Sequence, residues 1–172
     1  MSAEPIPTTP GPGPRLADGT FRHLFRRHAA GVAVVTVGGS APVGFTATSL
    51  SSLSAEPPLL SFNINRRSSS WPALRSAAAV AVHLLAHDQS ALATTFATSG
   101  IDRFARVPGW RRNRAGLPIL PDVLAWMTVE VRHLVDAGDH SLVVGEIVEA
   151  EVRDGRPLVY HDGQFARLAE DS

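Results

Sequence analysis

Hydrophobic and polar residues alternate along residues 124–135. The apolar positions are every second residue, and they would share one face: Ala125, Met127, Val129, Val131, His133 and Val135. Polar residues fall between them at 128, 130 and 132. Because successive side chains of a strand point to opposite faces, this pattern predicts a half-buried β-strand. On its apolar face we expect His133 to be a hydrogen-bonded interior histidine.

Six further segments are rich in β-branched and apolar residues and are separated by Gly, Pro and Asp turns. They are predicted to be strands over residues 32–37, 43–49, 58–64, 79–85, 141–152 and 157–161. Strands joined by hairpin turns, with only short helices between them, indicate a mainly β fold. We expect an antiparallel barrel.

Three segments are typical of short helices. In the first, apolar or aromatic residues recur at helical spacing: Phe21, Leu24, Phe25 and His28. It is expected to start at a cap, Asp18 or Thr20, and to end at Gly31. The second, residues 69–74, has serine caps and an early proline; the third, residues 88–96, has an acidic cap.

The chain divides into a tail and one domain. Residues 1–17 are rich in proline and glycine, which resist regular structure, and predict a flexible, partly extended tail. The tail either has no role or is an arm that packs on a partner subunit. Residues 18–170 are expected to form the single domain.

Composition narrows the chemistry. The 172 residues include 16 basic and 16 acidic side chains, and every basic one is arginine. Without lysine there is no Schiff base and no phosphate loop of the Walker type; without cysteine there is no thiol catalysis or disulfide. Zero net charge argues against a nucleic-acid partner. No apolar run is long enough for a membrane span and no signal-peptide pattern is present, so a cytoplasmic location is the expectation.

Familiar catalytic motifs are missing as well. There is no G-x-S-x-G, H-E-x-x-H or G-x-G-x-x-G pattern. His83 and His87 have a spacing that binds metal only on a helix, and His83 falls in a predicted strand, so no metal site is expected. No serine has a recognisable partner base, which argues against a hydrolase.

The segment from Gly44 to Pro72 is unusual because small hydroxyl residues dominate it. Small side chains let a flat ligand approach the backbone, and hydroxyls offer neutral hydrogen-bond donors. Arg66 and Arg67 precede a serine-capped helix, and arginines and helix N-termini both favour phosphate. One stretch could therefore hold an aromatic heterocycle and its phosphate. A loop whose hydroxyls are simply solvated explains the same pattern.

Several motifs resemble the flavin reductase family, the reductase components of two-component flavin-dependent monooxygenases. The resemblance covers about residues 20–168 in order and spacing. Its motifs are the strand at 31–36, the Thr-Ala-Thr-Ser to Glu-Pro-Pro block at 46–58, Asn65 with the serines at 68–70, and Gly-Asp-His at 138–140 through Gly-Glu-Ile at 145–147. The family fold is the flavin-binding split barrel, so the resemblance implies an antiparallel split β-barrel with a few short flanking helices.

The resemblance also implies roles for particular residues. Those that would contact the flavin ring, ribityl chain or phosphate are Thr46, Ala47, Thr48, Ser49, Ser52, Asn63, Ile64, Asn65, Arg66, Ser69, Ser70 and Phe96. Of these, Arg66, Ser69 and Ser70 would approach the phosphate. His140 would position the nicotinamide, and Asp139 would shape its turn or be an ordinary turn residue. Phe165 would either pack near the nucleotide or close the barrel.

The implied activity is that of an NAD(P)H:flavin oxidoreductase that reduces FAD or FMN and supplies free reduced flavin to a separate monooxygenase. NADH is favoured over NADPH, and a homodimer is expected. Such chemistry explains the missing catalytic motifs, because the cofactor carries the reaction while the protein orients it. The alternatives are a flavin-binding or electron-transfer module without NAD(P)H oxidation, and a barrel that binds no flavin.

Overall fold

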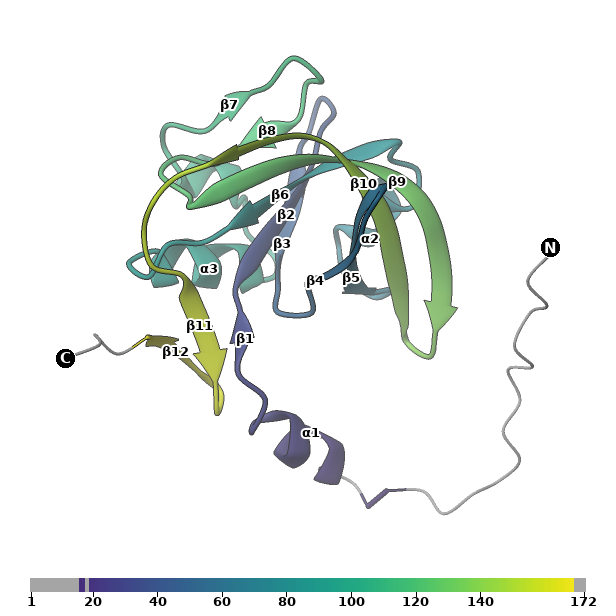
Figure 1. Cartoon of the computed structure of the whole chain (residues 1–172), viewed down its shortest axis with the longest axis vertical. Helices are drawn as coiled ribbons and strands as arrows, with labels where there is room; N and C mark the ends of the chain where they lie inside the picture. The colour runs from purple at the N-terminus through teal and green to yellow at the C-terminus, as the bar shows by residue number, and fades with distance from the viewer. Residues whose placement is uncertain (1–15, 18, 169–172) are drawn as a thin grey trace.

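Seven antiparallel strands form the main sheet of the computed structural model, which describes residues 16–17 and 19–168 (Figure 1). In spatial order they are β3 (Val43–Ala47), β2 (Ala33–Val37), β6 (Ala79–Leu84), β9 (Ala125–Ala137), β10 (His140–Val152), β5 (Pro58–Asn65) and β4 (Ser51–Ala55). The two edge strands, β3 and β4, are consecutive in the chain. The sheet curls so that Phe45 of β3 and Phe62 of β5 meet with ring centroids 6.2 Å apart.

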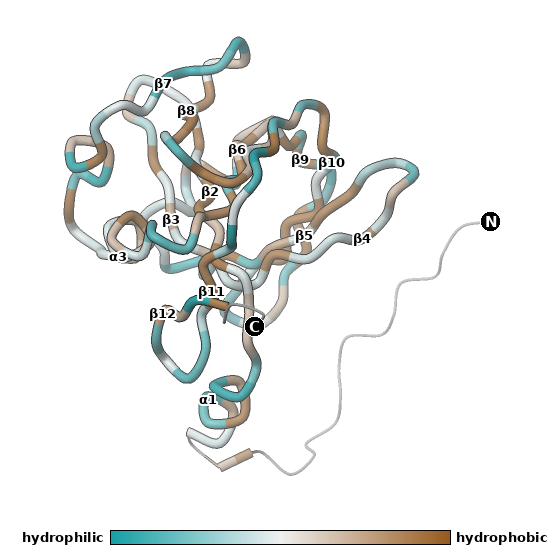
Figure 2. The backbone as a smooth tube through the Cα atoms, turned by 60° about the vertical axis from the view of Figure 1, so that its left-hand side comes forward, coloured by the Kyte–Doolittle hydropathy of each residue, from teal (hydrophilic) through white to brown (hydrophobic). Residues whose placement is uncertain are grey.

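Smaller elements surround this sheet. β1 (Ala30–Gly31), β11 (Leu158–His161) and β12 (Gln164–Arg167) form a three-stranded sheet, and β7 (Arg111–Arg112) pairs with β8 (Pro118–Ile119). The helices are α1 (Thr20–Phe25), α2 (Trp71–Leu74), α3 (Ser90–Ala97) and the 3₁₀ turn η1 (Phe104–Arg106). Both views place α1 apart from the main sheet (Figures 1 and 2).

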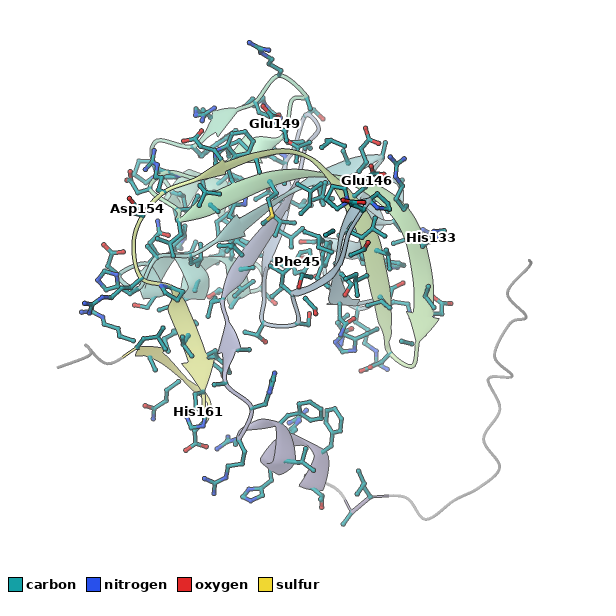
Figure 3. The ribbon with its side chains drawn as sticks, viewed as in Figure 1. Phe45, His133, Glu146, Glu149, Asp154 and His161 are labelled. Carbon is teal, nitrogen blue, oxygen red and sulfur yellow. The ribbon has the colours of Figure 1, made fainter. Side chains whose placement is uncertain are left out.

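Both faces of the central strands are buried. In β2, Val34 belongs to the core cluster beneath α3, whereas Val35 belongs to the cluster inside the curl. In β6, Ala81 and Val82 divide between the same two clusters. This explains why these strands read as continuous apolar runs, since a strand covered on both sides needs no polar face. Figure 3 shows Phe45 inside the curl.

The expectation of a mainly β fold with a few short helices is confirmed, and every predicted strand is present within a few residues of its expected bounds. The main sheet is open, however: β3 and β4 are edges and no pairing joins them among the described strands. β4 was not predicted from the sequence, because its five residues are all exposed and carry no hydrophobic alternation.

The helix starts differ from expectation. α1 ends at Phe25, well before Gly31, and its N-cap is Gly19, without a side-chain cap. Asp18, the other expected cap, lies outside the described residues, as does most of the proline-rich tail at 1–17. The N-cap of α3 is Gln89, not Asp88; its amide accepts from Ala86 N and donates to Pro121 O, so it holds the helix start to the core instead of capping it. Among the described residues, no helix is long and apolar enough to cross a membrane.

The prediction for His133 is wrong, because this side chain is exposed at the outer edge of β9 (Figure 3). The end of β9 extends beyond the core and is exposed from Arg132 onward, whereas its partner strand β10 keeps Ser141 and Val143 buried. Register shifts at Val144/Gly145 and Ile147/Glu149 also break the simple alternation that the sequence suggests.

The interior histidine is His83 of β6, which is fully buried. Its Nδ1 lies 3.0 Å from Val34 O, and its Nε2 accepts a hydrogen bond of 3.2 Å from Leu120 N. The ring must therefore be neutral with its hydrogen on Nδ1. Burial lowers the pKa of His83 from 6.5 to about 4, although the hydrogen bond to Val34 opposes that shift.

We predict that Gly44→Ala destabilises the protein. A Cβ at Gly44 would lie 2.7 Å from Phe96 Cε1 and 2.9 Å from Val35 O, so a buried ring or a strand must move. Overpacking of this kind costs about 1–3 kcal/mol, which urea denaturation will measure. Gly31→Ala is the control, since a Cβ there meets open space. Equal stability of the two variants would contradict the prediction.

We also predict acid sensitivity from His83. The unfolded chain takes up the proton near pH 6.5 and the native state only near pH 4, so the free energy of unfolding falls as the pH falls through this window. The loss amounts to about 3 kcal/mol at most. Urea denaturation between pH 7 and pH 4 should show a smaller pH dependence for His83→Gln than for wild type. Exposed His161→Gln should track the wild type, and parallel curves for all three proteins would refute this account.

Candidate functional site

An open cavity of about 1070 Å³ lies where several strands of the curled sheet end. Its wall combines the end of β3 with the following turn, the end of β5, the C-terminal end of α3, the β9–β10 turn and one side of α1. The lining residues are Phe21, Arg22, Phe45, Thr46, Ala47, Thr48, Ser49, Asn63, Ile64, Asn65, Arg67, Ser68, Phe96, Ala97, Ser99, Arg103, Ala137, Asp139 and His140.

α3 packs against β3 to make the floor of the cavity. Phe96 is completely buried and contacts Phe104 edge-on, with ring centroids 5.4 Å apart. It can lie directly on β3 because Gly44 has no side chain. Thr46 Oγ1 donates a hydrogen bond of 2.6 Å to Ala93 O, which ties the same helix to the strand. The Thr46 hydroxyl hydrogen is therefore used within the protein.

Small residues make the neighbouring wall. Ala47 ends β3 and Thr48 follows it, and Ser49 Oγ accepts a hydrogen bond of 2.9 Å from Asn63 N of β5. This bond lies one step beyond the last paired residues of β4 and β5, Ser51 and Ser61, and holds the β3–β4 connection to the end of β5. The side chains of Ala47, Thr48 and Ser49 are small, so this wall is a shallow surface of methyl, hydroxyl and backbone groups, which suits a flat ligand.

The turn after β5 is held by its own polar groups. Arg67 N donates to Asn65 Oδ1 at 2.8 Å, and Ser68 N donates to Asn65 O at 2.9 Å. Ser70 is fully buried, and its Oγ donates to Gly44 O at 3.1 Å. Ser70 thus fastens α2 to β3 and is not part of the cavity wall.

Asp139 and His140 form a pair at the β9–β10 turn. His140 Nδ1 lies 2.7 Å from Asp139 Oδ1. This hydrogen bond is the main reason that the pKa of Asp139 is lowered, with smaller contributions from the charges of His140 and Arg67. Because Asp139 is ionised, it accepts the hydrogen on His140 Nδ1, which leaves Nε2 for a ligand.

The lining carries three arginines, Arg22, Arg67 and Arg103, against one aspartate, so it favours an anion. Arg103 Nε donates to Thr98 O at 3.0 Å, which orients its guanidinium at the rim. Arg66 is placed differently. Its guanidinium donates to Gly138 O and pairs with Asp136 Oδ2 at 3.1 Å, and it is absent from the lining.

The structure brings together ten of the fifteen residues singled out by sequence: Thr46, Ala47, Thr48, Ser49, Asn63, Ile64, Asn65, Phe96, Asp139 and His140. Five lie outside the lining: Ser52, Arg66, Ser69, Ser70 and Phe165. Phe165 packs on Tyr160 with ring centroids 5.5 Å apart and against the core beneath α3.

Sequence reasoning missed Arg22 and Arg103 as cavity residues. Arg22 falls between the apolar positions of the first helix, and only the position of α1 beside the cavity brings it to the site. Arg103 lies in the loop that follows α3, where no motif or spacing points to a ligand.

Comparison with known proteins gives one consistent result. An NADH:FMN oxidoreductase from Rhodococcus qingshengii is 45% identical over 168 residues, which cover 94% of this chain and 88% of that protein. The reductase component of a 4-nitrophenol 4-monooxygenase/4-nitrocatechol 2-monooxygenase from Rhodococcus opacus is 36% identical over 149 residues, covering 86% and 80%.

Similarity to a solved structure points to the same family. The crystal structure of a flavin reductase domain protein from Arthrobacter sp. FB24 superimposes with a TM-score of 0.84 at 42% identity, covering 91% of this chain and 98% of that one. The family model described as "Flavin reductase like domain" matches residues 25–169. The chain therefore belongs to the flavin reductase family, as the motifs in its sequence indicate.

Proposed function

We propose that the protein is an NADH-dependent flavin reductase that supplies reduced FMN or FAD to a separate flavin-dependent monooxygenase. The observation that carries the proposal is a single cavity that combines a wall of small residues, an arginine rim and the Asp139–His140 pair. The relatives support it, since one is an NADH:FMN oxidoreductase and another is a monooxygenase reductase component.

The residues present fit a flavin. Ala47, Thr48 and Ser49 leave room for a flat ring system, and Asn63 and Asn65 offer polar side chains beside it. Arg67 and Arg103 can bind a phosphate through charge-assisted hydrogen bonds. Because Arg66 is engaged elsewhere, we assign the phosphate contact to these two arginines instead. A flavin held there would supply the redox chemistry, as the acceptor of hydride from a nicotinamide.

The chain itself binds and orients the two nucleotides. His140 Nε2, which the bond between Nδ1 and Asp139 leaves for a ligand, is suited to hydrogen-bond the nicotinamide carboxamide. Effective catalysis by orientation requires reacting atoms about 3–3.5 Å apart, so a positioning group is enough, and no protein nucleophile is needed.

The remaining parts of the proposal concern assembly. We assign the curled sheet to the split barrel of the family and the protein to a cytoplasmic homodimer. The apolar side chains of α1 support the dimer: Phe21, Leu24 and Phe25 are 60%, 57% and 52% exposed in the single chain, and a second subunit would cover them. A role for the N-terminal tail in that contact belongs to the same proposal.

Steady-state NADH oxidation with added FMN or FAD tests the activity directly. We expect turnover well above the blank of free flavin, and faster turnover with NADH than with NADPH. Flavin binding, seen as fluorescence quenching, without turnover would instead identify an electron-transfer module. Neither binding nor turnover would identify a barrel that binds no flavin.

We predict that His140→Ala lowers kcat/KM for NADH by roughly 10-fold or more, because nicotinamide orientation is lost. Flavin affinity should stay within about twofold of wild type, since this side chain is assigned to the other nucleotide. His133→Ala, an exposed histidine of the same hairpin, is the matched control. An equal loss of flavin binding and NADH turnover would show that His140 has been assigned to the wrong ligand.

For Arg103→Gln we predict an FMN dissociation constant raised roughly 10-fold, the loss of one charge-assisted contact. Lumiflavin, which lacks phosphate, should bind as it does to the wild type. Arg106→Gln, an exposed arginine of η1 outside the cavity lining, controls for general charge. Fluorescence titration measures both ligands; the assignment fails if FMN and lumiflavin weaken equally.

A further inference from the structure

The β9–β10 turn has to place His140 accurately although the turn and the end of β9 are exposed. From Arg132 to Asp139 every residue is exposed, which includes the end of β9 and the turn itself, whereas β10 begins with half-buried His140 and buried Ser141. Gly138 adopts a φ of +63°, a conformation that favours glycine and that lets the chain reverse. Hydrophobic packing therefore does little to fix the turn and the end of β9, the side from which the chain enters His140.

Arg66 supplies contacts that packing does not. Its backbone N–H donates to Asp139 O at 3.0 Å. Its Nη1 pairs with Asp136 Oδ2 at 3.1 Å, and its Nη2 donates to Gly138 O. Arg66, the first residue after β5, thus bonds three of the four residues that precede His140.

These contacts reach the turn from the neighbouring strand. His140 is also in register with Asn65 of β5 and with Ala137 of β9. The guanidinium of an arginine binds two acceptors in a fixed geometry. Together with the backbone N–H of Arg66, it makes three contacts to one turn, which restrict both displacement and rotation of that turn. A single exposed ion pair has little effect on stability. The effect expected of the Arg66–Asp136 pair is therefore on the position of the turn.

We propose that Arg66 is a positioning residue that clamps the β9–β10 turn and thereby holds the Asp139–His140 pair against the cavity. The expected effect of Arg66 on NADH turnover rests on the proposed function, whereas its effect on the order of the turn does not. It assigns Arg66 a role other than phosphate binding: its guanidinium would have to release Asp136 and Gly138 before it could reach a ligand.

The structural arm of the test is amide hydrogen exchange on the protein without ligand. Arg66→Gln should raise exchange at residues 137–140 about 10-fold or more, because the guanidinium anchors are removed. Arg132→Gln is the matched control, since Arg132 pairs with Glu130 and Glu146 on the same hairpin but away from the turn. Unchanged exchange in Arg66→Gln, or an equal rise in both variants, would overturn the clamp.

The functional arm compares Arg66→Gln in the wild-type and His140→Ala backgrounds. If Arg66 acts through His140, the variant lowers kcat/KM for NADH roughly 10-fold in the wild type and causes almost no further loss in His140→Ala. FMN affinity stays within twofold, and Arg66→Lys, which retains the charge, recovers part of the loss. Thermal melting verifies that each variant is folded.

Two results would overturn the functional arm: an equal loss in both backgrounds, or weaker binding of FMN but not lumiflavin, which would return Arg66 to the phosphate. Failure of the proposed function looks different. A wild-type protein that does not oxidise NADH refutes that function, while the exchange measurement still decides whether Arg66 clamps the turn.

Discussion

Burial of both faces of β2 and β6 is the constraint on which the rest of the structure depends. Two apolar faces need two covering layers, and a domain of this size has few elements to provide them. The sheet covers one face by curling over itself; α3 and residues 117–123 cover the other. His83 fastens this arrangement, since its ring bonds β2 on one side and Leu120 on the other.

The cavity is a result of that curl. The edge strands β3 and β4 do not pair, and the connection between them lines the cavity, held to β5 by the hydrogen bond from Asn63 N to Ser49 Oγ. The floor of the cavity belongs to the core as well, because Phe96 packs under β3 and also against Phe104. Changes to this floor therefore affect stability and ligand binding together, whereas the β9–β10 turn can vary with little effect on stability.

Sequence patterns predicted the strands well because most of them obey either alternation or continuous burial. They failed where tertiary position decides. His133 has the periodicity of an interior residue, but its end of β9 extends past the core, and His83 looked like any residue of an apolar strand. β4 carries no pattern because both of its faces meet solvent in the single chain.

The candidate site was predictable to the extent that its residues are contiguous. The run from Thr46 to Ser49 lines the cavity as a unit, as its small side chains suggest. Arginines were harder to place, because their long side chains can point several ways. Arg66 and Arg67 are neighbours in the chain, yet only Arg67 lines the cavity. The other lining arginines, Arg22 and Arg103, belong to segments distant in the sequence.

The hydroxyl groups of Thr46 and Ser49 show how a wall of simple side chains acquires directionality. Thr46 has given its hydrogen to Ala93 O, so what it can present to the cavity is a lone pair. Ser49 accepts from Asn63 N, which leaves its own hydrogen to be donated. Two chemically similar groups, three residues apart, thus have opposite polarity, and a heterocycle whose edge carries an N–H beside a C=O can satisfy both in only one orientation.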